Sequence, residues 1–204
     1  LTVTEPEALV RVRPGHRVLL DDGRLQARVA GVTSERLTLQ VEVGGTLFPN
    51  KGLNLPDSDL AIPAITKRDR EAIEAAMAAG ADWFALSFVR NASAAHELRG
   101  VLRGYGREVP ILAKIERPEA VTKSQEIIDA FDAIMVARGD LGVEIELEKV
   151  PHVQKRLINM ARAAGKRRVA QSRNFSSSST VVNGLPGLPL AASTRRRCSF
   201  PSRV

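Results

Sequence analysis

Residues 111–142 read ILAKIERPEAVTKSQEIIDAFDAIMVARGDLG, and this stretch decides both the fold and the candidate site. It contains two apolar runs typical of buried strands, ILAKIE and FDAIMVARGD, and each ends in charged residues. Lys114 and Glu116 end the first run, where a spacing of two places both on one face of a strand. Arg138 and Asp140 end the second run. If the two strands are parallel neighbours, Asp140 comes close to Lys114 and Glu116. Two carboxylates and an ammonium at the carboxyl ends of such strands favour a metal-assisted site for an anionic substrate.

Helix-like and strand-like segments alternate on both sides of this stretch. Residues 66–80, TKRDREAIEAAMAAG, predict an amphipathic helix with a cap formed by Thr66 and Asp69 and a stop at Gly80. Strands separated by helices of this length predict βαβ units and a parallel sheet. A fourth candidate strand, KRRVAQ, lacks the apolar pattern, so we expect three strands. The other expected helices are 93–106, 118–130 and 147–165, and the expected strands are 82–89, 109–116 and 131–140.

Residues 10–60 have a different pattern, with alternating residues and glycine-rich turns. The segment VLLDDGRLQARV places Asp-Gly between two apolar runs, which is a strong short-range signal for a β-hairpin. The segment RLTLQVEV alternates over its whole length and is followed by Gly44 and Gly45. This part of the chain predicts a small all-β unit of four to six short strands.

Composition fits a globular protein with a sizeable core, because 44% of the 204 residues are hydrophobic. No run of 18 apolar residues is present, so we expect no membrane span. The single cysteine excludes a disulfide framework and a cysteine-based metal site. The start, LTVTEPEALV, lacks both an initiator Met and a signal-peptide pattern, so we expect the chain to begin inside a longer, cytoplasmic protein.

The net charge of +7 comes entirely from the last part of the chain. Residues 166–204 hold eight of the 30 Lys and Arg residues and none of the 23 Asp and Glu residues. The preceding residues therefore carry 22 bases against 23 acids. The basic segment is rich in serine and has no sustained apolar period, which predicts disorder. Its run Arg195 to Arg197 could contact phosphates, but a solvated charge run is the commoner case, so we do not expect nucleic acid as a partner.

Several of these segments resemble motifs of a known family. ILAKIERPEAV is similar to the active-site signature of the pyruvate kinases, and MVARGDLGVEI is similar to their second hallmark. The resemblance continues through ITKRD, ADWFALSFVR, VPHVQKRLI, VLLDDGRL and NKGLNLP, and covers about residues 10–166. It implies an α/β fold, namely a partial (β/α)8 TIM barrel with a small inserted all-β lid domain. The implied divisions are a truncated lid (1–58), the partial barrel (59–166) and a basic tail, disordered or frameshifted (167–204).

The resemblance also implies a chemistry, which is phosphoryl transfer from phosphoenolpyruvate to ADP to give pyruvate and ATP in glycolysis. The implied cofactors are Mg²⁺, with Glu116 and Asp140 as its ligands, and K⁺, whose ligands lie outside this chain. Lys114 would be the catalytic residue, offsetting negative charge on the transferring phosphoryl and the enolate oxygen. The implied substrate-binding residues are Lys114, Gly139, Asp140, Ser87 and Arg90.

Some parts of the family pattern have no match in this sequence. The early barrel strands, which carry an arginine for the phosphoryl group, would precede Leu1. After Gly165, where the family has a strand ending in threonine, the sequence reads KRRVAQSRNF. We therefore expect this polypeptide to fold and to turn over poorly alone. The full-length family is expected to form homo-oligomers.

Other interpretations of the same residues remain open at this point. Lys114 and Glu116 could form an ordinary strand-end ion pair, and Asp140 could cap a helix. With both surrounding motifs intact, an inherited site is favoured. A magnesium-dependent lyase or aldolase of the phosphoenolpyruvate/pyruvate barrel type would also use a Glu and an Asp at strand ends, but it would lack the lid. A non-catalytic protein with a nucleic-acid-binding tail would show salt-sensitive binding that is lost when residues 166–204 are deleted.

Overall fold

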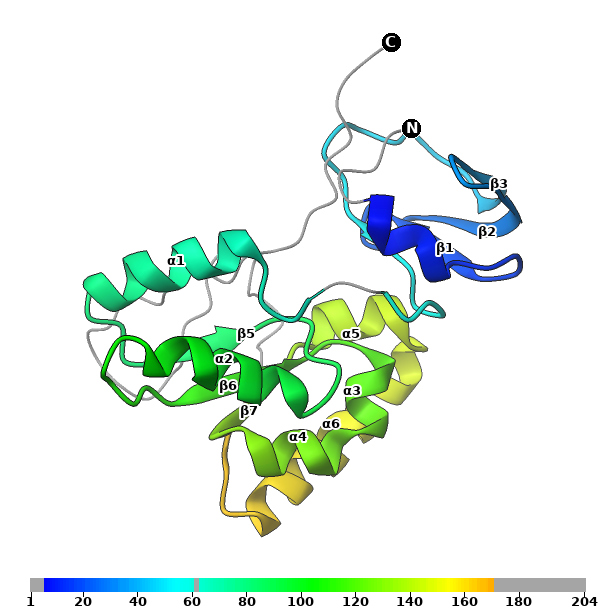
Figure 1. Ribbon diagram of the computed structural model, residues 1–204. Helices are drawn as coiled ribbons and strands as arrows, with labels where there is room; N and C mark the ends of the chain where they lie inside the picture. The colour runs from blue at the N-terminus through cyan, green and yellow to red at the C-terminus, as the bar shows by residue number, and fades with distance from the viewer. Residues whose placement is uncertain (1–5, 61–62, 171–204) are drawn as a thin grey trace. The chain divides into compact units, whose positions relative to one another are not determined.

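The computed structural model describes residues 6–60 and 63–170, which belong to two compact units that divide between residues 63 and 64 (Figure 1). The first unit is a β-sheet unit, and the second combines strands and helices. The predicted change of pattern between the two parts of the chain is therefore confirmed. The basic segment from residue 171 onward lies outside the described residues.

The first unit contains a four-stranded antiparallel sheet with the strand order β3-β2-β1-β4. The predicted hairpin is confirmed, because Leu20 and Leu25 pair across a four-residue turn. Asp21, Asp22 and Gly23 all have positive φ in this turn, a conformation that glycine and aspartate tolerate best. The elements of this unit are η1 (Pro6–Arg11), β1 (Arg17–Leu20), β2 (Leu25–Val32), β3 (Leu37–Val43) and β4 (Leu53–Asn54).

The second unit contains a parallel sheet whose four strands lie side by side in chain order: β5 (Phe84–Leu86), β6 (Ile111–Ile115), β7 (Ala133–Val136) and β8 (Arg167–Ala170). Helices connect consecutive strands, so the predicted α/β class and parallel sheet are confirmed. Strand order that follows chain order differs from the doubly wound folds, in which the order reverses. The helices are α1 (Lys67–Ala78), α2 (Ser93–Arg103), α3 (Pro118–Thr122), α4 (Ser124–Ala130), α5 (Arg138–Glu144), η2 (Leu147–Lys149) and α6 (Val150–Ala163).

Helix boundaries follow the local chemistry of the sequence. The predicted cap of α1 is present, because the Asp69 carboxylate accepts the Thr66 N–H at 2.7 Å and the Thr66 hydroxyl accepts the Asp69 N–H at 3.1 Å. Gly80 and Gly165, just beyond α1 and α6, both have positive φ as C-terminal stops require.

The two faces of the parallel sheet have different neighbours. On one face Ile111, Ala113 and Ile115 are fully buried in the main core, together with residues of the helices. On the other face Leu112 packs in a smaller apolar cluster, to which each of the four strands contributes at least one residue. That cluster consists of Leu112, Ala133 and Met135, with Trp83, Ala85 and Val169 against it. Lys114 shares this second face, because it is two residues after Leu112.

A fourth strand is present where three were expected. Residues Arg167–Ala170 pair with β7 along their whole length. The two arginines hide this strand in the sequence, but the Arg167 guanidinium lies 5.5 Å from the centre of the Trp83 ring, and Val169 joins the apolar cluster. Lys166 donates to the carbonyls of Asp129 and Phe131, which places the start of β8 beside β7. Contacts between distant residues therefore determine this strand.

Two further expectations need correction. Residues 118–130 form two short helices, because Lys123 leaves the helical conformation with ψ of 22°. The strand expected at 131–140 ends at Val136, and Arg138 already begins α5. Leu141 is fully buried in the main core, so the chain must turn back directly after the strand.

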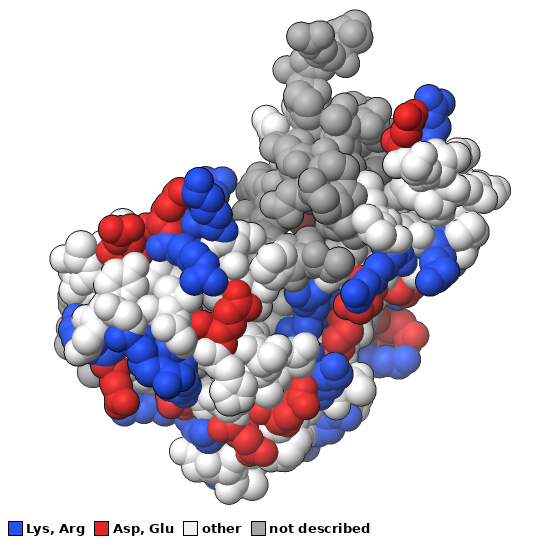
Figure 2. Space-filling model, viewed as in Figure 1, with Lys and Arg blue, Asp and Glu red and all other residues white. Residues whose placement is uncertain are grey.

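Charged side chains of both signs are interspersed on the face of the molecule in Figure 2. This agrees with the near balance of acids and bases counted for residues 1–165. Among the described residues, none of the helices has the length and apolar character that crossing a membrane requires.

Candidate active site

Three of the predicted site residues come together at the carboxyl ends of β5 and β6. Ser87 directly follows β5, Lys114 is the fourth residue of β6, and Glu116 directly follows β6. The Lys114 ammonium donates to the Ser87 hydroxyl at 3.1 Å and forms an ion pair with the Glu116 carboxylate. Parallel pairing of β5 with β6 produces this contact, because it brings the ends of both strands to the same edge of the sheet. The arrangement holds a positive and a negative group where parallel α/β sheets bind ligands.

Glu116 is almost completely buried, with 1% of its side chain exposed. Its Oε2 accepts the backbone N–H of Phe88 at 2.8 Å. Phe88 has a φ of 54°, which is unusual for a residue with a large side chain and marks local backbone strain beside the carboxylate. Burial raises the pKa of Glu116, the charge of Lys114 opposes this rise, and the charge of Asp140 adds to it. Glu116 and Asp140 follow the neighbouring parallel strands β6 and β7, so both lie beyond the same end of the sheet.

Gly139 and Asp140 lie in the first turn of α5, directly beyond the carboxyl end of β7, and not on a strand as expected. Asp140 is half-buried and Gly139 is exposed. A Cβ built on Gly139 would meet no atom within 4 Å, so the backbone there is open to a close approach. Arg90 is half-buried in the loop that joins β5 to α2, three residues beyond Ser87. All the predicted site residues therefore follow or end strands at the same edge of the sheet.

The available ligands suit a magnesium ion. Within residues 6–60 and 63–170, no three or more His, Cys, Asp or Glu side chains are grouped so that they could hold a metal. Glu116 and Asp140 offer two carboxylates, one of them buried against a lysine. Mg²⁺ is commonly bound by one or two carboxylates, with water and substrate phosphates as its remaining ligands. The donor set therefore fits this ion.

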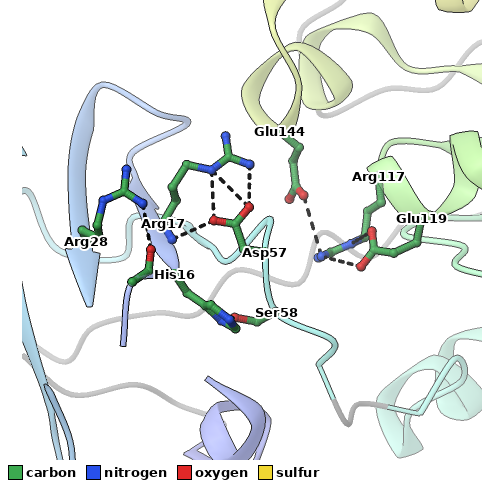
Figure 3. Close-up of polar contacts among 9 residues, drawn as sticks. His16, Arg17, Arg28, Asp57, Ser58, Arg117, Glu119 and Glu144 are labelled. Carbon is green, nitrogen blue, oxygen red and sulfur yellow. Dashed lines mark hydrogen bonds and ion pairs between the residues drawn. The ribbon is translucent and has the colours of Figure 1, made fainter. Parts of the chain in front are cut away.

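A buried charged cluster next to the site was missed by reasoning from the sequence (Figure 3). Arg117 follows Glu116 and exposes only 6% of its side chain. Its guanidinium donates to both oxygens of Glu119, at 3.0 and 3.1 Å, and lies 3.7 Å from Oε2 of Glu144. The only sequence signal was the spacing of four between Asp140 and Glu144, which places both on one face of a helix.

The first unit holds a separate charged cluster, also drawn in Figure 3. The Arg17 guanidinium donates to both oxygens of Asp57, and the Arg17 backbone N–H donates to the same carboxylate at 2.9 Å. These hydrogen bonds lower the pKa of Asp57 below its ordinary value. The ring of His16 lies 2.8 Å from the Ser58 hydroxyl. These contacts tie the segment after β4 to β1, which is a structural role.

Comparison with known proteins supports the resemblance noted in the sequence. A family model described as "Pyruvate kinase, barrel domain" matches residues 1–181. Pyruvate kinase of Methylorubrum extorquens is 48% identical over 161 residues, which cover 79% of this chain and 33% of the relative. Pyruvate kinase of Corynebacterium glutamicum is 45% identical over 154 residues, or 76% of this chain and 32% of the relative. Pyruvate kinase of Thermotoga maritima is 41% identical over 151 residues, which cover 74% of this chain and 32% of the relative.

The chain thus spans about a third of the length of these curated relatives. The family match covers the first unit, the parallel sheet and every predicted site residue. This chain belongs to the pyruvate kinase family.

Proposed function

We propose that this chain carries part of a pyruvate kinase active site, which transfers a phosphoryl group from phosphoenolpyruvate to ADP and yields pyruvate and ATP. The observation that carries the proposal is the contact of Lys114 with Ser87 and Glu116 at the carboxyl end of the sheet, with Asp140 just beyond the neighbouring strand β7. A buried ammonium beside two carboxylates is suited to an anionic substrate that binds together with a divalent cation.

Lys114 is assigned the catalytic role. Its ammonium is held by Ser87 and Glu116 in a site that is largely shielded from water, since 11% of the lysine side chain is exposed. A charge in such a site acts more strongly on a substrate than a charge in water. Its task is to stabilise negative charge on the transferring phosphoryl and on the enolate oxygen that is left behind.

Glu116 and Asp140 are assigned as the ligands of Mg²⁺. When bound, the ion neutralises charge on the phosphoryl and substrate oxygens. The exposed backbone at Gly139 and the half-buried Asp140 side chain are assigned to substrate binding, and Ser87 and Arg90 line the same edge. K⁺ is the second expected cation, and we assign it no ligand among the described residues.

The fold is assigned in the same way as part of a (β/α)8 barrel with an inserted β domain. Strand order that follows chain order and helices between all consecutive strands support the barrel assignment. Residues 1–58, within the first unit, are assigned as the inserted lid domain, residues 59–166 as barrel, and residues 167–204 as a tail, of which Arg167–Ala170 extend the sheet. The proposed setting is glycolysis in the cytoplasm, with phosphoenolpyruvate and ADP or ATP as partners and homo-oligomers formed by the full-length protein.

Membership in the pyruvate kinase family favours this function over the lyase interpretation. Because the chain spans a third of its relatives, the direct test is ligand binding by this chain. Mn²⁺, which also prefers carboxylate and water ligands, is added with phosphoenolpyruvate, and free Mn²⁺ is counted by electron paramagnetic resonance. We expect phosphoenolpyruvate to increase Mn²⁺ binding, and Glu116→Gln and Asp140→Asn each to abolish this increase.

The matched control is Asp82→Asn, which removes an exposed carboxylate at the opposite end of the sheet. It should bind Mn²⁺ as the unchanged chain does. If Glu116→Gln and Asp140→Asn bind Mn²⁺ and phosphoenolpyruvate as well as Asp82→Asn does, the proposed site is wrong.

A further inference from the structure

A buried ion pair joins the two elements that carry the proposed metal ligands (Figure 3). Arg117 directly follows Glu116 at the end of β6, and Glu144 ends α5, one helical turn after Asp140. The Arg117 and Glu144 side chains expose 6% and 1% of their surface, and the distance between Nη2 and Oε2 is 3.7 Å. Each partner is therefore at most one turn away along the chain from a proposed ligand.

The geometry of the guanidinium is fixed from a second side. Glu119, in the first turn of α3, accepts from both Nε and Nη2 of Arg117. Such a fork-like pair fixes the plane of the guanidinium, which a lysine at this position would not do. Arg117 therefore presents its charge to Glu144 from a rigid position.

The second anchor matters because α5 is short. Leu141 is fully buried and fixes how deeply this seven-residue helix lies in the core. Within α5 only Leu141 and Glu144 are buried, so Glu144 is the second point that limits rotation about the helix axis. Asp140 and Glu144 lie on one face of the helix, so a contact that holds Glu144 also sets the direction in which Asp140 points.

We propose that Arg117 and Glu144 form a positioning pair that sets the relative placement of the Glu116 and Asp140 carboxylates and thereby the affinity for a divalent cation. This inference rests on the proposed function, because it takes those two carboxylates as the metal ligands. Two charges buried at an element junction are a costly way to provide stability alone, since apolar residues of similar volume often serve at least as well. Residues behind metal ligands commonly orient them.

The alternative is that both residues act on the cation only through their charge. The two explanations predict changes in cation affinity of different sign for the Arg117 variant. By charge alone, Arg117→Met would tighten cation binding and Glu144→Gln would weaken it. In the double variant the two effects would cancel. If the pair positions the ligands, both single variants should bind the cation more weakly. The double variant should then bind no more weakly than the weaker-binding single variant, because either substitution already breaks the contact.

The test is a titration of the full chain with Mn²⁺ alone, read by electron paramagnetic resonance. We expect Arg117→Met, Glu144→Gln and the double variant each to bind Mn²⁺ about 10- to 100-fold more weakly, as loss of an outer-shell partner typically does. The matched control is Arg99→Met, which breaks the Arg99–Asp132 ion pair at the opposite end of the same sheet and should leave Mn²⁺ affinity unchanged.

The inference is overturned if Arg117→Met binds as tightly as the unchanged chain or more tightly. It is also overturned if Arg99→Met weakens binding as much as the other variants do, since the effect would then report stability alone. Circular dichroism checks the fold of each variant. If a single variant unfolds, the double variant serves as the test, because it buries no unpaired charge. A double variant that binds Mn²⁺ with the affinity of the unchanged chain overturns the inference. Failure of the unchanged chain to bind Mn²⁺ would instead contradict the proposed function and the inference together.

Discussion

At the carboxyl end of the parallel sheet three charged side chains around the end of β6 are buried, whereas the acidic side chains at the amino end remain in contact with water. Lys114, Glu116 and Arg117 expose 11%, 1% and 6% of their side chains. Asp82 and Asp132, which precede β5 and β7, expose 45% and 36%. Burying a charge is unfavourable even when it is paired. The difference supports the proposed use of the carboxyl end for ligand binding.

The largest difference between the two ends is expected when one partner of an ion pair is removed. Lys114→Met leaves the Glu116 carboxyl buried without its cation, and we expect it to lower the free energy of unfolding at neutral pH by about 3–5 kcal/mol. Arg107→Met breaks the exposed pair with Asp82 and should lower it by about 0–1 kcal/mol. Urea unfolding followed by circular dichroism measures both values. Equal losses at the two ends would refute the comparison.

The pH dependence of stability sharpens the comparison at Glu116. Its pKa is raised in the folded protein, so the folded chain holds the proton more tightly than the unfolded chain. The contribution of Glu116 to the free energy of unfolding should therefore be greatest below the ordinary glutamate pKa of 4.5 and fall as the pH rises through the raised value. Glu116→Gln should remove this fall. Asp82→Asn, at the amino end, should keep this loss of stability with rising pH. If the loss persists in Glu116→Gln, it belongs to another titrating group.

Much of the second unit could be predicted from local patterns. The capping residues of α1 and the strand of Lys114 follow from local periodicity and capping chemistry, whereas Ser87 was expected at the site only from the resemblance to the pyruvate kinases. The fourth strand was missed because its contacts are with residues that are distant in the sequence. Arg167 lies over the Trp83 ring, and Val169 packs against the smaller apolar cluster around Leu112.

The buried pair of Arg117 and Glu144 was missed for a similar reason. In the sequence both are charged residues beside a motif, and the usual expectation is that such residues face solvent. Their contact exists because α5 begins at Arg138 and folds back toward the end of β6. The sequence pattern instead suggested a strand that runs on to Asp140. An error in one boundary therefore concealed the contact next to the site.

A smaller effect is expected at Phe88, whose backbone N–H donates to Glu116. Phe88→Pro removes that donor and cannot adopt the φ of 54°, so Mn²⁺ binding should weaken about tenfold. Phe88→Gly keeps the donor and adopts this conformation without strain, so Mn²⁺ binding should remain near that of the unchanged chain. Similar Mn²⁺ affinities for the two variants would show that the strained amide does not position Glu116.

A small effect on stability is also expected at Arg167, at the amino end. Arg167→Met removes the contact of the guanidinium with the Trp83 ring and should lower the free energy of unfolding by about 0.5–1 kcal/mol. Mn²⁺ affinity, measured in parallel, should not change. A loss of Mn²⁺ affinity without a matching loss of stability would mean that the amino end also contributes to the site.

The central claim is that the divalent cation binds at the carboxyl end of this sheet, and paramagnetic broadening of nuclear magnetic resonance signals tests it directly. The chain has one tryptophan, so the indole N–H of Trp83 gives a single signal from the amino end. Strand β6 alone separates the two ends by about 13 Å, at roughly 3.3 Å per residue. We predict that increasing Mn²⁺ broadens the amide signals of Phe88 and Gly139 before the Trp83 indole, with this order lost in Glu116→Gln. Broadening of the Trp83 indole before the other two signals would contradict the account.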